Sequence, residues 1–290
     1  MNVFVVGGSG VLGQQLVPML LENACRVTVM APGARLRHLP TGVETVPASL
    51  VGPETAELLR GRLAGEHVVV NLASAIPADP RAPGGWELNS RLRRYGTRVL
   101  VEAVRAAGVP QLVQMSITMA YADGGDRWLD ESAPFDSDPA RVGLVQPVTE
   151  MESIVTRLDP SEVRWTVLRG GRFVGPGTGQ DAQQTALRAG RLSVAGSGQS
   201  FMSMVHVRDY AAAVVAAVRV GPAGLVCNVT AEPVRQAEYL DVLAHLVGAA
   251  RPASDPIAAP DLPSQRVSSD RARRELGWQA RHGVWPDGGW

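Results

Sequence analysis

The chain has 290 residues, enough for one large domain or two coupled domains. Its 28 acidic residues balance 28 basic residues, so no net charge is present to attract nucleic acid or an anionic membrane surface. All 28 basic residues are Arg. The absence of Lys excludes a Schiff-base Lys, a Walker-type phosphate Lys and any Tyr-x-x-x-Lys catalytic pair.

The cysteines and the start of the chain indicate the compartment. Cys25 and Cys227 lie far apart, each in an apolar run, which is typical of buried free thiols in a reducing compartment. The apolar start at 1–6 has no basic segment before it and ends at Gly7, too short for a signal peptide or a membrane span. We therefore predict a cytoplasmic protein that binds no metal, nucleic acid or membrane. The sequence leaves the oligomeric state open.

Short apolar runs alternate with helical stretches along the first 170 residues, and the run at 2–6 is typical of a strand covered on both faces. This alternation predicts an α/β fold with a doubly wound parallel sheet of the Rossmann type over 1–170, with later returns near 204–230. The expected strands are 2–6, 26–30, 43–46, 68–72, 111–116 and 165–168, and the expected helices are 11–21, 53–63, 88–107 and a stretch near 149–157.

The remainder, 171–290, is predicted to form mainly a smaller, discontinuous C-terminal domain that binds the substrate. Irregular segments at 175–179 and 252–263 alternate there with sheet-like pieces around 204–207 and 225–229. The tail at 283–290 is expected to be a flexible end or a flap.

A glycine-rich turn, Gly7-Gly-Ser-Gly-Val-Leu-Gly13, lies directly between the first strand and the first helix. Gly7 permits a tight turn, Gly10 lets backbone N–H groups approach a pyrophosphate, and Gly13 allows close packing of helix on strand. The helix N-terminus adds a partial positive charge. A dinucleotide site is therefore predicted at Gly7, Ser9, Gly10, Val11, Leu12 and Gly13.

The end of the second expected strand indicates which dinucleotide binds. A free ribose 2′-hydroxyl is usually met there by Asp or Glu, but the sequence at 29–37 has no acid and carries Arg35 and Arg37. The planar guanidinium fork suits a phosphate. NADP(H) is therefore the predicted cofactor, with Arg35 the first candidate for the 2′-phosphate and Arg37 the second.

Five further segments, together with the glycine turn, resemble the extended short-chain dehydrogenase/reductase family over nearly the whole chain. They are Asn71-Leu-Ala-Ser74, Trp86-Glu-Leu-Asn89 with Gly96-Thr97, Leu168 to Pro176, Val205 to Ala211, and Ser268 to Trp278. The resemblance implies an NAD(P)-dependent oxidoreductase of a small molecule. It also implies cofactor contacts at Leu72, Ala73, Ser74, Arg169, Gly170 and Gly171.

The family's reaction uses a Ser or Thr after the fifth strand and a Tyr-x-x-x-Lys pair on the next helix. Neither 146–150 nor 144–148, the two registers for that pair, contains Tyr or Lys. Ser116 and Thr118 are the candidate hydroxyls, and strand alternation would place both on one side of the strand. Either could instead bond neighbouring backbone. Tyr121 is expected to pack, with proton donation as the alternative.

Three acidic residues are expected to have structural rather than catalytic roles. Glu150 and Glu152 are expected on a solvated helix face. Asp209 opens an apolar helical run and is expected to be its N-cap.

An extended-type reductase without the Tyr–Lys pair is similar to the ketoreductases that tailor aromatic polyketide antibiotics. The leading hypothesis is an NADPH-dependent reduction of a ketone on a bulky polycyclic substrate, with the proton supplied by substrate, water or Ser/Thr. The alternative is a non-catalytic NADP(H)-binding regulator or partner protein. A nucleotide-sugar epimerase or dehydratase is weakened because those reactions need the missing Tyr.

Overall fold

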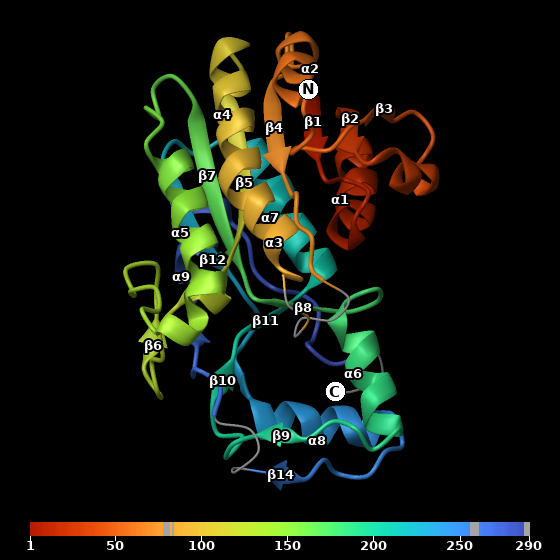
Figure 1. Cartoon of the computed structure of the whole chain (residues 1–290), viewed down its shortest axis with the longest axis vertical. Coiled ribbons are helices and arrows are strands. Elements are labelled where there is room, and N and C mark those ends of the chain that lie inside the picture. The colour runs from red at the N-terminus through yellow and green to blue at the C-terminus, as the bar shows by residue number, and fades with distance from the viewer. Residues whose placement is uncertain (78–81, 83, 256–260, 287–290) are drawn as a thin grey trace. The chain divides into compact units, whose positions relative to one another are not determined.

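A computed structural model describes residues 1–77, 82, 84–255 and 261–286. Its main feature is a seven-stranded sheet of order β12-β7-β5-β4-β1-β2-β3 (Figure 1). Strand β1 lies inside the sheet: β2 and β3 follow on one side of it, and β4, β5, β7 and β12 follow on the other. This change of side at β1 is the arrangement of the predicted doubly wound Rossmann fold. The strands are β1 (Asn2–Val6), β2 (Arg26–Ala31), β3 (Glu44–Pro47), β4 (Val68–Asn71), β5 (Gln111–Ile117), β7 (Arg164–Gly170) and β12 (Leu225–Val229).

Strand β1 shows why this sequence forms a buried parallel sheet. Val5 pairs with Val29 of β2 on one side and with Val70 of β4 on the other, both in parallel register. All three side chains are fully buried. A continuous β-branched run suits a strand that is covered on both faces, because each residue packs whichever way it points.

Helices cover both faces of the sheet: α2 contacts α4, α4 contacts α5, and α7 lies behind the strands (Figure 1). Among the described residues no helix is long and apolar enough to cross a membrane. The helices are α1 (Val11–Glu22), α2 (Thr55–Arg62), α3 (Glu87–Arg91), α4 (Thr97–Ala106), α5 (Val142–Thr156), α6 (Gly179–Arg188), α7 (Val207–Val220), α8 (Gln236–Leu246) and α9 (Asp270–Leu276), with short 3-10 helices η1 (Gly33–His38), η3 (Thr118–Ala120) and η4 (Pro139–Arg141).

Two helices differ from their predicted form. The helix expected over 88–107 is interrupted by a π-helical turn, η2 (Leu92–Gly96), between α3 and α4. Helix α5 begins at Val142, well before the expected start near Thr149. Pro147 lies within its first two turns, where few backbone hydrogen bonds are lost, so the proline does not prevent the earlier start.

The chain divides into two compact units. Unit 1 comprises Met1–Ser116, Ser137–Leu168 and Ala211–Cys227, and unit 2 comprises Ile117–Asp136, Arg169–Tyr210 and Asn228–Trp290. Residues 117–136, assigned from sequence to the first domain, therefore cluster with the second, and both units are discontinuous. Residues 287–290 of the tail lie outside the described residues.

Unit 2 contains two-stranded pairs rather than a large sheet. They join β8 (Arg172–Val174) with β11 (Met204–His206), β10 (Phe201–Met202) with β13 (Val234–Arg235), β9 (Val194–Ala195) with β14 (Ser254–Asp255), and β6 (Trp128–Leu129) with β15 (Arg266–Val267).

The C-terminal segment of unit 2 is fixed at its described part rather than free. Val284 is buried, and the carboxylate of Asp209 accepts hydrogen bonds from the backbone N–H groups of Arg281 and His282 at 2.8 Å each. Asp209 lies in the first turn of α7, which begins at Val207, so it is not the expected N-cap. It instead anchors residues distant in sequence.

Candidate active site

The glycine turn in unit 1 has the geometry of a phosphate cradle. Gly7 has φ +79°, a conformation that L side chains rarely adopt, and a Cβ there would lie 2.9 Å from the backbone N of Ala73. A Cβ on Gly13 would lie 2.0 Å from the carbonyl oxygen of Gly8, so helix α1 packs directly against the turn. A Cβ on Gly10 would meet only one atom, at 3.5 Å, and would occupy the space before the helix.

The N-terminus of α1 is open toward this space. Its N-cap is Gly10, and no side chain caps the helix there. The first turn contains no acidic residue. Backbone N–H groups and the helix dipole therefore remain available for an anionic group, as a pyrophosphate requires. The residues present fit a dinucleotide.

The loop after β4 forms the neighbouring wall of unit 1. The backbone N of Leu72 donates to the carbonyl of Val6 at 2.9 Å, and the N of Ala73 donates to Oδ1 of Asn71 at 3.1 Å. Oδ1 of Asn89 accepts from the N of Ala75 at 3.1 Å. The two asparagines thus fix the backbone around Leu72, Ala73 and Ser74, the segment predicted to contact the cofactor.

The residues predicted to bind the 2′-phosphate lie beside the end of β2. Strand β2 ends at Ala31, and Arg35 and Arg37 are exposed on η1, four and six residues later. His38 ends the same short helix, so three basic side chains stand where a dinucleotide with a free 2′-hydroxyl would need an acid.

The candidate hydroxyl Ser116 is buried in unit 1 and its proton has a partner. Ser116 Oγ donates to Oε1 of Glu152 at 2.5 Å. Glu152 is only 5% exposed, so the expectation that it lies on a solvated face of α5 is wrong. Glu150, two residues earlier, is partly exposed and forms an ion pair with Arg94 at 3.0 Å.

Arg93 lies in the same buried region of unit 1. It belongs to the π-helical turn η2 and is 9% exposed. Burial lowers the pKa of its guanidinium to about 10, and the negative charge of Glu152 opposes that shift. Arg93 therefore remains protonated at neutral pH, and its charge interacts with that of Glu152.

Thr118 does not continue the strand that carries Ser116. Strand β5 ends at Ile117, and Thr118 begins the 3-10 turn η3, so the argument from strand alternation does not extend to it. In unit 2 its hydroxyl donates to the carbonyl oxygen of Gly170 at 3.3 Å. This bond to backbone is the alternative that the sequence left open.

Tyr121 packs in the core of unit 2, as expected. Its phenol donates to Oδ1 of Asn228 at 2.8 Å and accepts from Nη1 of Arg169 at 2.7 Å. Burial raises the pKa of Tyr121 to about 12, against the lowering effect of Arg169. A phenol with that pKa, whose proton already has an internal acceptor, is poorly suited to proton donation near neutral pH.

The three predicted cofactor residues of unit 2 all have packing partners within that unit. The guanidinium of Arg169 lies 4.5 Å from the ring centre of Phe135 and 5.2 Å from that of Tyr121. A Cβ on Gly170 would lie 2.5 Å from the ring of Tyr210, and one on Gly171 would lie 2.8 Å from a backbone oxygen. These contacts account for the residue types, and cofactor contact at 169–171 stays a prediction.

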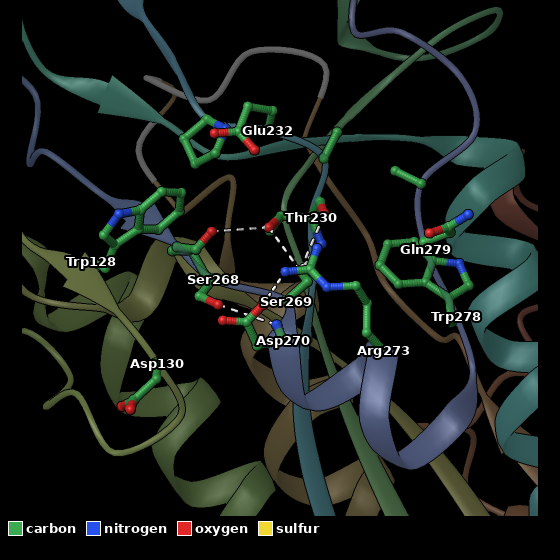
Figure 2. A pocket seen from close by; sticks show the side chains of 14 residues that line it. Trp128, Asp130, Thr230, Glu232, Ser268, Ser269, Asp270, Arg273, Trp278 and Gln279 are labelled. Carbon is green, nitrogen blue, oxygen red and sulfur yellow. Dashed lines mark hydrogen bonds and ion pairs between the residues drawn. The ribbon is translucent and has the colours of Figure 1, made fainter.

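A separate cavity of about 680 Å³ lies within unit 2 (Figure 2). Trp128 and Trp278 stand on opposite sides of it, and hydroxyl groups of Thr230 and Ser269 lie between them and bond to each other at 2.9 Å. Its lining, taken from the described part of the chain, includes none of the residues predicted for cofactor or catalysis. In the same part of the chain, no group of three or more His, Cys, Asp or Glu could hold a metal ion.

The doubly wound sheet, the phosphate cradle and the fixed loop after β4 define a dinucleotide-binding α/β protein of the oxidoreductase type. Residues 3–230 match the model of the NAD dependent epimerase/dehydratase family. The chain belongs to this family, and it is an NAD(P)-dependent oxidoreductase.

Several relatives act on small molecules. The chain is 36% identical to a 3-diazoavenalumate denitrifying reductase from Streptomyces sp., over 99% of both chains. It is 26% identical to a 4-hydroxy-2-methyl-3-oxo-4-farnesyl-3,4-dihydroquinoline-1-oxide ketoreductase from Stigmatella aurantiaca, over 86% of this chain and 74% of the relative.

Solved structures support the fold. The dTDP-glucose 4,6-dehydratase DesIV from Streptomyces venezuelae, with NAD bound, superposes with a TM-score of 0.82 at 21% identity and covers 98% of this chain and 93% of its own. MoeE5 in complex with UDP-glucuronic acid and NAD gives a TM-score of 0.80 at 22% identity, covering 98% and 95%. At these identities the likeness concerns the fold.

Proposed function

We propose that the protein is an NADPH-dependent reductase that delivers hydride to an aromatic small molecule without an acid from a Tyr–Lys pair. When bound, the cofactor supplies the hydride. Gly7, Gly10 and the first turn of α1 would hold its pyrophosphate, and Arg35 with Arg37 would hold the 2′-phosphate. The chain has no Lys, so the pair that normally supplies the proton does not exist here.

This proposal rests on one observation: each candidate hydroxyl group already donates its proton to an acceptor within the protein. Ser116 donates to Glu152, Thr118 to the carbonyl of Gly170, and Tyr121 to Asn228. A hydroxyl has one proton, so none of the three can also donate to a substrate without breaking an internal bond. The chain is thus suited to a hydride acceptor that needs no proton from the protein.

A ketone of an aromatic polyketide is one such acceptor. When a phenol stands beside the carbonyl, its internal hydrogen bond can supply the proton: the carbonyl carbon gains hydride, the oxygen gains the phenolic proton, and water restores the phenol. This fits an angucyclinone 7-ketoreductase of the simocyclinone type, to which the degenerate site is similar. The ketoreductase relative from Stigmatella aurantiaca also supports a ketone.

An arenediazonium ion is a second candidate, favoured by the name of the relative that is 36% identical over nearly the whole chain. Hydride adds to the ring carbon, the carbon–nitrogen bond breaks, and dinitrogen leaves with that bond's electron pair. The nicotinamide is oxidised and the arene reduced. No proton is consumed, so a family member that reduces a diazonium ion has no use for the Tyr–Lys pair.

The test is to incubate the purified protein with [4-²H]NADPH, in separate reactions with each 4-deuterio stereoisomer. Two panels of acceptors are offered: polycyclic ketones with and without a hydroxyl beside the carbonyl, and hydroxy-substituted arenediazonium salts. Mass spectrometry then locates the deuterium in an alcohol or in an arene. Transfer from one stereoisomer only would show that the protein orients the cofactor, and non-enzymatic reduction would use both.

The outcomes separate the hypotheses. Deuterium in a secondary alcohol supports the ketone, and deuterium on the ring with release of dinitrogen supports the diazonium ion. Tight NADPH binding without transfer to either panel would favour the non-catalytic NADP(H)-binding alternative. The same assay tests the proposed polycyclic substrate. Localisation of the tagged chain tests the proposed cytoplasmic location.

A further inference from the structure

Three polar side chains from separate elements lie together in the interior of unit 1. Ser116 is the penultimate residue of β5, Glu152 lies on α5, and Arg93 lies in the π-helical turn η2. They are 1%, 5% and 9% exposed. Because β5 is parallel to β4, and β4 to β1, Ser116 stands at the same carboxyl edge of the sheet as the glycine turn.

Stability alone does not account for this cluster. Burying charged and polar side chains costs free energy that their hydrogen bonds recover only with good geometry, and apolar side chains of similar volume are often as stable or more stable in their place. Removing one partner is costly, because a buried charge is then left alone. The π-helical turn that carries Arg93 is a local irregularity of the kind that occurs frequently at functional sites.

The hydrogen bonding assigns a direction to the Ser116 hydroxyl. At 2.5 Å the bond from Ser116 Oγ to Glu152 Oε1 is short, as expected when the acceptor is an ionised carboxylate. The proton of Ser116 is therefore held on Glu152, and the hydroxyl cannot rotate without losing this hydrogen bond.

We propose that Glu152 is a positioning residue, which acts through Ser116 by fixing its hydroxyl proton on a buried carboxylate. The Ser116 hydroxyl at the end of β5 then keeps one constant polarity during hydride transfer: its proton stays on Glu152, and only its oxygen can accept a further hydrogen bond. The inference rests on the proposed reductase function and deepens it. The inference explains how a Ser at the family's usual place is kept from acting as a proton donor. A site of this kind favours hydride acceptors that need no proton from the protein.

A double-mutant cycle with a matched control tests the assignment. The variants are Glu152→Gln, Ser116→Ala, the double variant, and Glu150→Gln, which removes a carboxylate from the partly exposed side of the same helix. Single-turnover hydride transfer, NADPH affinity by fluorescence and thermal unfolding are measured for each. Without the carboxylate the Ser116 hydroxyl can turn, and the constant polarity at the end of β5 during hydride transfer is lost. Because a charge-assisted bond contributes about 1.5–3 kcal/mol, Glu152→Gln should slow hydride transfer about tenfold or more.

The expected pattern is specific to positioning. NADPH affinity should stay within about twofold in Glu152→Gln, Glu150→Gln should behave as wild type, and the double variant should be no slower than Ser116→Ala alone. Equal rates for Glu152→Gln and wild type, or losses that multiply in the double variant, would overturn the proposal. If Glu152→Gln does not fold, Glu152→Met with Arg93→Met removes both charges and should fold, with the same slow transfer.

Failure of the proposed function has a different signature. A wild-type chain that binds NADPH but transfers no hydride would overturn the reductase assignment, and with it a role for Glu152 in transfer. The unfolding measurements would in that case still show coupling between Ser116 and Glu152. A wild-type chain that transfers hydride, with independent effects of the two substitutions, would overturn only the positioning role.

Discussion

The phenolic oxygen of Tyr121 lies 2.7 Å from Nη1 of Arg169, and it donates its own proton to Asn228 at 2.8 Å. The guanidinium also donates to the carbonyl of Glu131 and lies over the rings of Phe135 and Tyr121. A tyrosine placed close in sequence to the family's catalytic hydroxyl is therefore part of the polar core of unit 2. Two predictions follow from this arrangement.

Replacing Tyr121 with Phe should cost stability and leave the chemistry intact. The substitution removes one hydroxyl, so Nη1 of Arg169 and Oδ1 of Asn228 each lose a buried hydrogen bond, a loss of about 1–3 kcal/mol in the free energy of unfolding. Urea unfolding at pH 7 measures the loss. Single-turnover hydride transfer at a temperature where the variant is folded should match wild type, and a loss of 10²-fold or more would identify Tyr121 as the missing acid.

The same phenol should make stability fall at high pH. The pKa of Tyr121 rises from its ordinary value of 10.0 to about 12 in the folded chain. Below pH 10 both states keep the proton, whereas between about pH 10 and 12 the unfolded chain loses it first, so unfolding becomes favoured. Two pKa units correspond to about 2.7 kcal/mol. Comparing urea unfolding of wild type and Tyr121→Phe across this range isolates the contribution, and parallel curves would contradict it.

The sheet and the glycine turn could be predicted from sequence because local pattern determines them. The run at 2–6 needs no partner information to be identified as a buried strand, and the glycine spacing at 7, 10 and 13 directly after it is specific to a dinucleotide-binding turn, in which Gly7 and Gly13 leave no room for a side chain. The start of α5 could not be placed from pattern. The helix includes Pro147, and a proline within its first two turns costs few backbone hydrogen bonds, so this residue does not mark where the helix begins.

The interior polar contacts could not be predicted because they join residues far apart in the chain. Glu152 and Ser116 are 36 residues apart, and an acidic residue beside Glu150 gives no local sign of burial. One signal was available: Glu152 is two positions from Glu150, so the two cannot share one face of a helix. Arg93 gave no such signal, because the π-helical turn that turns it inward has no pattern of its own.

The turn between β1 and α1 should tolerate no side chain at Gly13. A Cβ there would lie 2.0 Å from backbone atoms of Gly8, which cannot move like the end of a flexible side chain. Gly13→Ala should therefore lose most NADPH binding in a fluorescence titration and lower the melting temperature. Gly143→Ala is the control, because nothing lies within 4 Å of that position in α5, and Ala there should raise stability by up to about 1 kcal/mol. Unchanged NADPH affinity in Gly13→Ala would contradict the cradle.

Replacing Asp209 with Asn should release the C-terminal segment of unit 2. The carboxylate is 3% exposed and accepts from two backbone N–H groups through Oδ2 and from Nδ1 of His282 through Oδ1. An amide has only one oxygen, so at least one donor loses its acceptor, at a cost of about 1–3 kcal/mol. Hydrogen exchange at 281–286 should accelerate more than in Asp241→Asn, which alters only an exposed ion pair. Equal exchange in the two variants would contradict the anchoring role.

The cofactor preference should depend on Arg35. The side chain is exposed on η1 beyond the end of β2, where no acid is present to bind a free 2′-hydroxyl. A guanidinium that pairs with the 2′-phosphate contributes about 1.5–3 kcal/mol, so Arg35→Ala should weaken NADPH binding about tenfold or more and leave NADH binding nearly unchanged. Titrations with both dinucleotides measure the difference, and Arg37→Ala should show a smaller effect of the same kind.

Arg105→Ala removes an exposed ion pair on α4 and serves as the control. Equal losses for NADPH and NADH in Arg35→Ala would show that the residue does not distinguish the phosphate, and a preference for NADH in the wild type would exclude NADP(H) as the natural cofactor.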